Sequence, residues 1–259
     1  MKLPMTFCLT FDDGFKVHHD IVAPMLEAHG WRGTFNVPTE FMKSNHAPLT
    51  ADQLWDCRLN GNENNLMTWD DVRDLVRRGH EVYPHTLGHV DLLQLEQMGK
   101  IDELLRQIAE SRSQFIAELG YEPKFFCSPH NSWSETILAA IRGHGMELLN
   151  CSRRNFPTHP TRKPPAPSIS EYVLNEWSCG TAHIDIMIHG VDGTRGGWEP
   201  FATVEEFGKF LDELKDLEQS RYVRVVSYQS SHVGPGLFLR ERLFVRRVTN
   251  KLRRMIFSL

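Results

Sequence analysis

Two short stretches of this chain contain residues whose types and spacing could support chemistry. Asp12 and Asp13 are adjacent carboxylates that directly follow an apolar run, and Gly14 comes next. Further along the chain, His85 and His89 are four positions apart. On one helical turn this spacing brings two imidazoles to a common point, which is the arrangement that a divalent metal ion needs. Together the two stretches predict a metal site that includes carboxylates.

Each stretch also has a simpler interpretation. An Asp-Asp-Gly sequence after a strand is common in turns and at helix N-caps. A surface histidine and a core histidine can stand four residues apart by coincidence. From either stretch alone, both interpretations stay open.

The elements around these residues would place them at equivalent positions. Residues 5–11 are predicted to form a buried strand, and the carboxylates cannot continue into a core, so the strand ends at Asp12. Gly14 then supplies the turn. Residues 80–83 are predicted to form another strand, and His85 follows its end. Parallel sheets and barrels carry their chemistry at the carboxyl ends of strands, which is where both sets would lie.

The rest of the chain alternates between predicted strands and helices. The further strands are predicted at residues 33–37, 124–127, 147–151, 183–189 and 222–227, and the helices at 21–29, 68–78, 93–119, 135–142 and 203–217. Residues 38–65 are interpreted as a polar surface insertion, 152–170 as a proline-rich loop and 190–197 as a glycine-rich rim. This alternation predicts a parallel sheet with helices outside, but it does not distinguish a closed barrel from an open sheet.

Three segments resemble motifs of a known family. Thr-Phe-Asp-Asp-Gly at 10–14 and His-Thr-Leu-Gly-His at 85–89 resemble the first two motifs of the polysaccharide deacetylase family, also called the NodB homology domain or carbohydrate esterase family 4. The apolar strand that ends in His189 resembles the fifth motif. The resemblance implies an α/β fold, an irregular NodB-like (β/α) barrel of about seven parallel strands.

The resemblance also implies roles for individual residues. Asp13, His85 and His89 would hold a divalent cation, with Zn²⁺ expected and Mn²⁺, Co²⁺ or Ni²⁺ as alternatives. Asp12 would be the general base, and His189 would protonate the leaving amine. A histidine that ends an apolar strand can also be purely structural, so this alternative for His189 stays open.

The third motif of the family, Arg-x-Pro-x-Gly, is only half present. Cys127 stands where the family has the Arg that steadies the catalytic carboxylate, and Asn131 stands where it has Gly. His130 could replace that Arg as a partner of Asp12, contact the substrate, or be an ordinary loop histidine. The substrate-binding residues predicted in and after this motif are Pro129, His130, Asn131 and Trp133.

Composition narrows the class of protein. The net charge of −4 over 259 residues gives no reason to expect a nucleic-acid partner. The five cysteines are odd in number and include no Cys-x-x-Cys pair, which favours thiols in a reducing compartment. The apolar N-terminus meets Asp12 too early to be a signal peptide, and no segment is long enough to span a bilayer. These features predict a cytoplasmic protein.

The C-terminal residues 240–259 differ in charge from the rest. They contain seven Lys or Arg and one acid, Glu241, so this segment carries +6 and residues 1–239 carry −10. Apolar residues recur at helical spacing within it. We predict a catalytic domain over 1–239 and a basic amphipathic helix over 240–259. That helix either packs on the domain or lies at the inner face of an anionic membrane as a peripheral contact.

The expected function is therefore a metal-dependent hydrolase that removes an N-acyl group, most simply acetyl, from a sugar. The cytoplasmic prediction points to an intermediate of cell-surface polysaccharide biosynthesis, of the O-antigen type, linked to a nucleotide or a lipid. The altered third motif leaves open a deformylase or an amidase acting on a different small amide. A catalytically inactive sugar-binding homologue is the further alternative.

Overall fold

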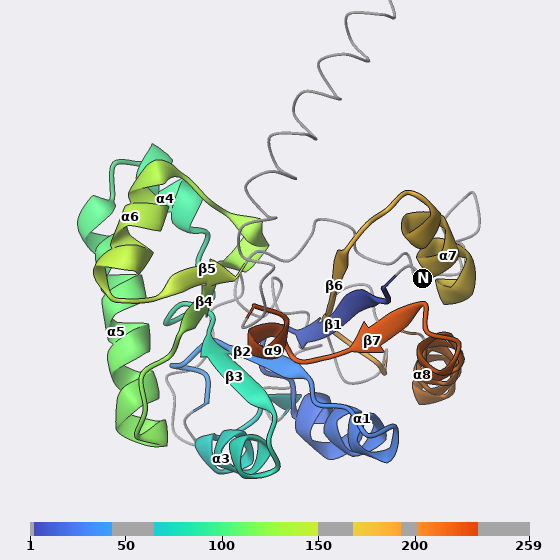
Figure 1. Cartoon of the computed structure of the whole chain (residues 1–259). Helices are drawn as coiled ribbons and strands as arrows, with labels where there is room; N and C mark the ends of the chain where they lie inside the picture. Colours follow the sequence, from blue (N-terminus) through green and yellow to red (C-terminus); the bar gives the residue numbers. More distant parts are fainter. Residues whose placement is uncertain (1–2, 43–64, 150–167, 193–200, 202, 233–259) are drawn as a thin grey trace, which may run out of the picture.

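The computed structural model describes residues 3–42, 65–149, 168–192, 201 and 203–232 (Figure 1). This part of the chain contains seven strands, and every strand pair in it is parallel. The strands are β1 (Met5–Phe11), β2 (Thr34–Val37), β3 (Glu81–Pro84), β4 (Phe125–Cys127), β5 (Glu147–Leu149), β6 (His183–Ile188) and β7 (Val223–Val225). The parallel arrangement agrees with the alternating pattern of the sequence.

Strand β1 is the centre of the larger sheet. The strand order is β3-β2-β1-β6, and β7 also pairs with β1. Strand β6 pairs with β1 from Thr6 to Phe11, whereas β2 pairs at Thr10 and Phe11 and β7 pairs from Met5 to Phe7. Because β6 occupies one edge of β1 along this length, β2 and β7 share the other edge. Strands β4 and β5 form a separate pair.

The longer helices lie outside the strands, whereas the short α9 lies among the strands (Figure 1). The chain order is η1 (His18–Val22), α1 (Ala23–Ala28), α3 (Trp69–Arg77), α4 (Leu92–Gln97), α5 (Ile101–Leu119), η3 (Pro129–Asn131), α6 (Glu135–Gly143), α7 (Ile169–Ser178), α8 (Val204–Gln219) and α9 (Tyr228–His232). Thr68 and Asp71 form the capping box expected at the start of α3.

Three helical segments differ from the sequence prediction. The single helix predicted over 93–119 is two helices, α4 and α5, because Gly99 has a φ of 70° and ends the first. Helix α7 was not predicted; it begins at Ile169, inside the predicted loop, where the Ser168 side chain caps it. Helix α9 follows β7 and was not predicted.

The two faces of β1 are chemically different. Phe7, Leu9 and Phe11 belong to the main apolar core. Burying a side chain of this size contributes about 1.5–3 kcal/mol, so the alternating residues of β1 hold the strand firmly. Thr6, Cys8 and Thr10 occupy the other face, because side chains alternate along a strand. The site described below is therefore attached to a well-packed strand.

Several predictions fall outside the described residues. These are most of the 38–65 insertion, residues 152–167 of the proline-rich loop, residues 193–197 of the glycine-rich rim and the basic helix over 240–259. Within the described residues, none of the helices combines the length and apolarity that crossing a bilayer requires.

Candidate active site and metal centre

The carboxylates at the end of β1 lie on a tight left-handed turn. Asp13 has a φ of 75° and Gly14 a φ of 71°. A Cβ atom on Gly14 would lie 2.6 Å from Cε of Met42, so both the backbone angle and the space favour glycine here. Asp12 is 2% exposed and Asp13 is 0% exposed, so the turn buries two carboxylates side by side.

His85 and His89 converge, but not through the helical turn that their spacing suggested. The segment after β3 is a non-helical turn in which Thr86 has a φ of 64° and His89 a φ of 55°. The two ring centroids are 5.1 Å apart. The prediction of a helix was therefore wrong, because two left-handed residues reverse the chain within the same four-residue spacing.

Gln107 of α5 holds this turn in place. Its side-chain Oε1 accepts hydrogen bonds from the backbone N–H groups of Leu87 and Gly88, each at 3.1 Å. Gln107 is buried, and its Nε2 donates to Glu103 at 2.8 Å. Gln107 was not predicted as part of the site. The one available signal was a polar residue on the apolar stripe of a helix.

The side chains of Asp13, His85 and His89 meet at one point. Oδ1 of Asp13 lies 2.9 Å from Nε2 of His89 and 3.4 Å from Nε2 of His85. The three ligand atoms lie within 4.8 Å of one another. Neither carboxylate oxygen of Asp13 has a hydrogen bond among the described residues, although both are buried. A buried carboxylate in that state fits a cation between the three groups.

The second nitrogen of His85 fixes the orientation of its ring. Nδ1 of His85 donates a hydrogen bond to the backbone carbonyl of Cys127 at 3.0 Å. This bond leaves the lone pair of Nε2 directed at Asp13. Metal-binding histidines usually donate their other N–H in this way, and the contact sets the tautomer.

The local charges favour an anionic Asp13. Burial alone would raise the pKa of Asp13, but the nearby imidazoles of His89, His85 and His189 hold that pKa well below its usual range. Burial alone would lower the pKa of His85, but the carboxylates of Asp13 and Asp12 raise it. The site therefore keeps the charge that a cation would bind.

Asp12 is held by two other side chains. Nδ2 of Asn36 donates to Oδ1 of Asp12 at 2.6 Å. Sγ of Cys127 donates to Oδ2 at 3.8 Å. Asn36 reaches this position because β2 pairs with β1 at Phe11, one residue before the carboxylate. Asn36 was not predicted as part of the site, and Cys127 occupies the place where the family has Arg.

His189 lies directly after β6, at the same end of the sheet as Asp12. Nε2 of the buried His18 hydrogen-bonds to the backbone carbonyl of His189. Burial lowers the pKa of His18 to about 4, so this ring is neutral and donates to the carbonyl at physiological pH. His18 anchors the chain at His189, and it was also missed from the sequence. Only its place on an amphipathic segment hinted at burial.

The altered third motif forms the 3-10 turn η3. His130 and Asn131 have positive φ values of 58° and 52°. His130 is exposed, and its ring centroid lies 5.4 Å from that of His89. Trp133 is 48% exposed, Asn131 is half-buried and Pro129 is buried. Among these four residues, His130 and Trp133 offer side chains that a substrate could reach.

The fold and these motifs define a class of protein. A family model described as polysaccharide deacetylase matches residues 4–149, and the chain belongs to this family. It is 25% identical over 157 residues to a chitin deacetylase of Pestalotiopsis sp., a match that covers 58% of this chain and 42% of that protein. The chain thus spans less than half the length of that relative.

Solved structures share the fold. The peptidoglycan deacetylase PdaC from Bacillus subtilis aligns over 97% of each chain with a TM-score of 0.53 and 16% identity. A mutant of a carbohydrate esterase family 4 pseudoenzyme with restored activity aligns over 88% of this chain and 67% of that chain, with a TM-score of 0.58 and 15% identity. The predicted family and the predicted NodB-like α/β barrel are both confirmed.

Proposed function

We propose that this protein is a metal-dependent hydrolase that removes an N-acyl group, most simply acetyl, from a sugar. The observation that carries the proposal is the buried carboxylate of Asp13, which has no hydrogen bond among the described residues and faces two imidazole nitrogens. Asp12, a second buried carboxylate, is its neighbour in the chain. One carboxylate is thus available to bind a cation and the other to move a proton.

Asp13, His85 and His89 would hold the ion. Their mixed oxygen and nitrogen donors suit Zn²⁺, and also Mn²⁺, Co²⁺ or Ni²⁺. A bound divalent ion would supply Lewis acidity, which polarises a carbonyl and lowers the pKa of a bound water molecule to about 7. Side chains of this protein would carry out the proton transfers.

Asp12 is the proposed general base. Its carboxylate accepts the proton of the attacking water, while the hydrogen bond from Asn36 fixes its orientation. His189 is the proposed general acid, which donates a proton to the leaving amine nitrogen. His18 supports this role, because it anchors the backbone of His189 without itself carrying a charge.

The substrate proposal rests on the surface around the site. His130 is exposed beside the ring of His89, and Trp133 is exposed three residues further along the chain. An aromatic ring can stack on the apolar face of a sugar. Pro129 and Asn131 would shape the turn that presents them. We assign these four residues to substrate binding, with His130 closest to the acyl group because its ring contacts that of His89.

We extend the proposal to an intermediate of cell-surface polysaccharide assembly, of the O-antigen type and linked to a nucleotide or lipid carrier. The support is the basic segment 240–259, whose charge complements the phosphates of such carriers or an anionic membrane. Liposome co-sedimentation of the chain with and without these residues tests the membrane contact. Equal pelleting would contradict it.

Acetate and formate release from N-acetyl and N-formyl sugars tests the proposed reaction. The wild type, loaded with zinc, should release acetate, and Asp12→Asn should bind zinc normally but lose activity by about 10²–10⁴-fold. Asp102→Asn, an exposed carboxylate at the start of α5, is the matched control and should keep full activity.

The same assay separates the alternatives. Formate without acetate would replace the deacetylase by a deformylase, and release from a non-sugar amide alone would indicate an amidase. Bound zinc with no turnover of any acyl amide would indicate an inactive sugar-binding homologue. Cys127 in place of the family's Arg favours these alternatives, while the presence of both carboxylates and all three histidines favours the deacetylase.

A further inference from the structure

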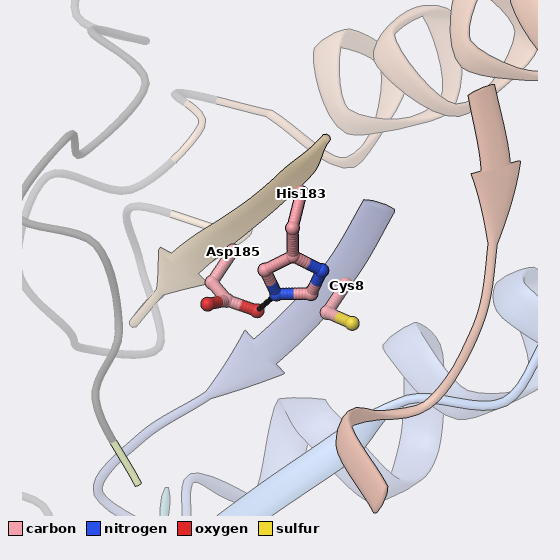
Figure 2. Close-up of side chains that lie close together, drawn as sticks. All are labelled: Cys8, His183 and Asp185. Atoms are coloured by element: carbon pink, nitrogen blue, oxygen red, sulfur yellow. Dashed lines mark hydrogen bonds and ion pairs between the residues drawn. The ribbon is translucent and has the colours of Figure 1, made fainter. Parts of the chain in front are cut away.

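A second cluster of metal-ligand residues lies away from the candidate active site. Figure 2 shows Cys8 on β1 with His183 and Asp185 on the adjacent β6, on the same side of the two strands. Their ligand atoms lie within 4.8 Å of one another. Cys8 precedes Asp12 by four strand residues, which corresponds to about 13 Å. His183 begins β6, whereas His189 follows its other end.

The strand register brings these residues together. Cys8 is the direct partner of Asp185, and Thr6 is the direct partner of His183. Direct partners on neighbouring strands point to the same face of a sheet. Cys8 is 0% exposed and Asp185 is 3% exposed. The register thus fixes a buried sulfur atom and a buried carboxylate beside one imidazole.

The Thr6 hydroxyl lies beside the other ring nitrogen of His183. Its oxygen is 2.6 Å from Nδ1 of His183 and 3.3 Å from the carbonyl oxygen of Ala182. A hydroxyl that donates to Ala182 can accept the N–H of Nδ1, and this is the tautomer that a metal ion on Nε2 requires. Nε2 of His183 lies 2.5 Å from Oδ1 of Asp185, a hydrogen-bond distance in the metal-free chain, and an ion bound by both groups would replace the proton between them.

We propose that Cys8, His183 and Asp185 form a second metal site, with zinc or a similar thiophilic divalent ion as the ligand. A thiolate, an imidazole and a carboxylate are all donors that zinc accepts. A metal-binding histidine usually donates its other ring N–H to an oxygen. In this cluster the Thr6 hydroxyl oxygen lies beside Nδ1 of His183. The ring of His183 is 21% exposed, which gives the ion a route to the buried donors.

A catalytic thiol explains this cluster less well. A nucleophilic cysteine needs a base nitrogen directed at its sulfur. Here Nδ1 of His183 faces Thr6 and Nε2 faces Asp185, while Sγ of Cys8 contacts the carbonyl of Ser227 at 3.8 Å. Buried donors on two strands of the sheet instead suit an ion that ties β1 to β6.

Metal content separates this site from the proposed active site. With zinc in excess followed by dialysis, we expect two zinc ions per wild-type chain, measured by mass spectrometry. Asp13→Asn combined with His89→Gln should bind one, and Cys8→Ser added to that double variant should bind none. Cys179→Ser, at a cysteine away from the cluster, is the matched control.

Cobalt gives a second measurement that does not depend on activity. The double variant loaded with Co²⁺ should show thiolate-to-cobalt charge-transfer absorption, which Cys8→Ser removes and Cys127→Ser leaves unchanged. Thr6→Val should weaken zinc binding in that background by about 10–100-fold, whereas Thr10→Val on the same strand should not.

The results that overturn the proposal are equally specific. A double variant that binds no metal, or cobalt absorption that persists in Cys8→Ser, would contradict the second site, and a proton would then lie between His183 and Asp185. Because His183 is partly exposed, His183→Gln repeats the test if Cys8→Ser does not fold. A wild-type protein that binds zinc at the second site but releases no acetate would instead count against the proposed function.

Discussion

Asn36 donates a hydrogen bond to Asp12 across neighbouring strands, with 2.6 Å between Nδ2 and Oδ1. The amide is itself buried, and it lies on β2 beside the end of β1. This contact, together with the thiol of Cys127, fixes the carboxylate that we propose as the general base. Asn36 is therefore a positioning residue in this account.

Removing this amide should impair turnover but not metal binding. We expect Asn36→Ala to lower kcat for acetate release by about 10–100-fold, because Asp12 loses the donor that orients it. The zinc content should remain that of the wild type. Kinetics and metal analysis on the same preparation check this prediction. A loss of zinc in parallel with activity would show that Asn36 acts on the fold of the site instead.

Neutralising Asp13 should remove one zinc ion. Asp13→Asn keeps the shape of the side chain but removes the charge that faces His85 and His89. We expect one zinc equivalent fewer than in the wild type, and a smaller rise in stability on adding zinc. A site saturated at 100 times its Kd contributes about 2.7 kcal/mol to the free energy of unfolding, so denaturant titrations resolve this change. Unchanged zinc content would exclude Asp13 as a ligand.

Gln107 should control metal affinity from a distance. Its carbonyl oxygen accepts two backbone hydrogen bonds in the turn between His85 and His89. We expect Gln107→Ala to raise the zinc Kd of the active site by about 10–100-fold, measured by competition with a chelator. Gln114→Ala on the same helix is the matched control and should bind zinc as the wild type does. Equal affinities for the two variants would refute this role.

His18 should make stability depend on pH. Burial lowers its pKa from 6.5 to about 4 in the folded protein, so the unfolded chain binds the proton more readily. The free energy of unfolding is therefore highest above the pKa that His18 has in the unfolded chain. It falls as the pH drops from 6.5 towards about 4. The loss attributable to this residue is about 2 kcal/mol between about pH 7.5 and about pH 5.

Urea unfolding at these two pH values measures that contribution. His18→Gln should show a smaller loss of stability than the wild type by this amount. His144→Gln, at the end of α6, should retain the wild-type dependence. If His18→Gln and His144→Gln lose the same stability, burial of a neutral His18 is not the cause.

The fold was largely predictable from local patterns. The apolar run of β1, the apolar alternation of β6 and the capping box at Thr68 marked elements that the structure contains. Helices α7 and α9 and the break at Gly99 were missed. Helix α9 is too short for periodicity to reveal, and α7 begins in the stretch that was assigned to the proline-rich loop. The break at Gly99 lies in a stretch whose charged and apolar residues keep a helical pattern.

The residues of the candidate site could be predicted only where they lie close together in the sequence. Asp12 and Asp13 are adjacent, and His85 and His89 are four residues apart. The side chains of Asp13, His85 and His89 meet at one point. Asn36 and Gln107 reach the site through strand pairing and helix packing. Such long-range contacts leave no spacing signal in the sequence. The left-handed angles at Thr86 and His89 likewise depend on the tertiary structure that surrounds them.

The central claim is that Asp13, His85 and His89 bind one metal ion beside Asp12. Anomalous X-ray diffraction at the zinc edge, on crystals of the zinc-loaded full chain, tests it most directly. We expect an anomalous peak within about 2.0–2.2 Å of a carboxylate oxygen of Asp13 and of Nε2 of both histidines. A fully loaded protein with no anomalous peak among these three side chains would contradict it.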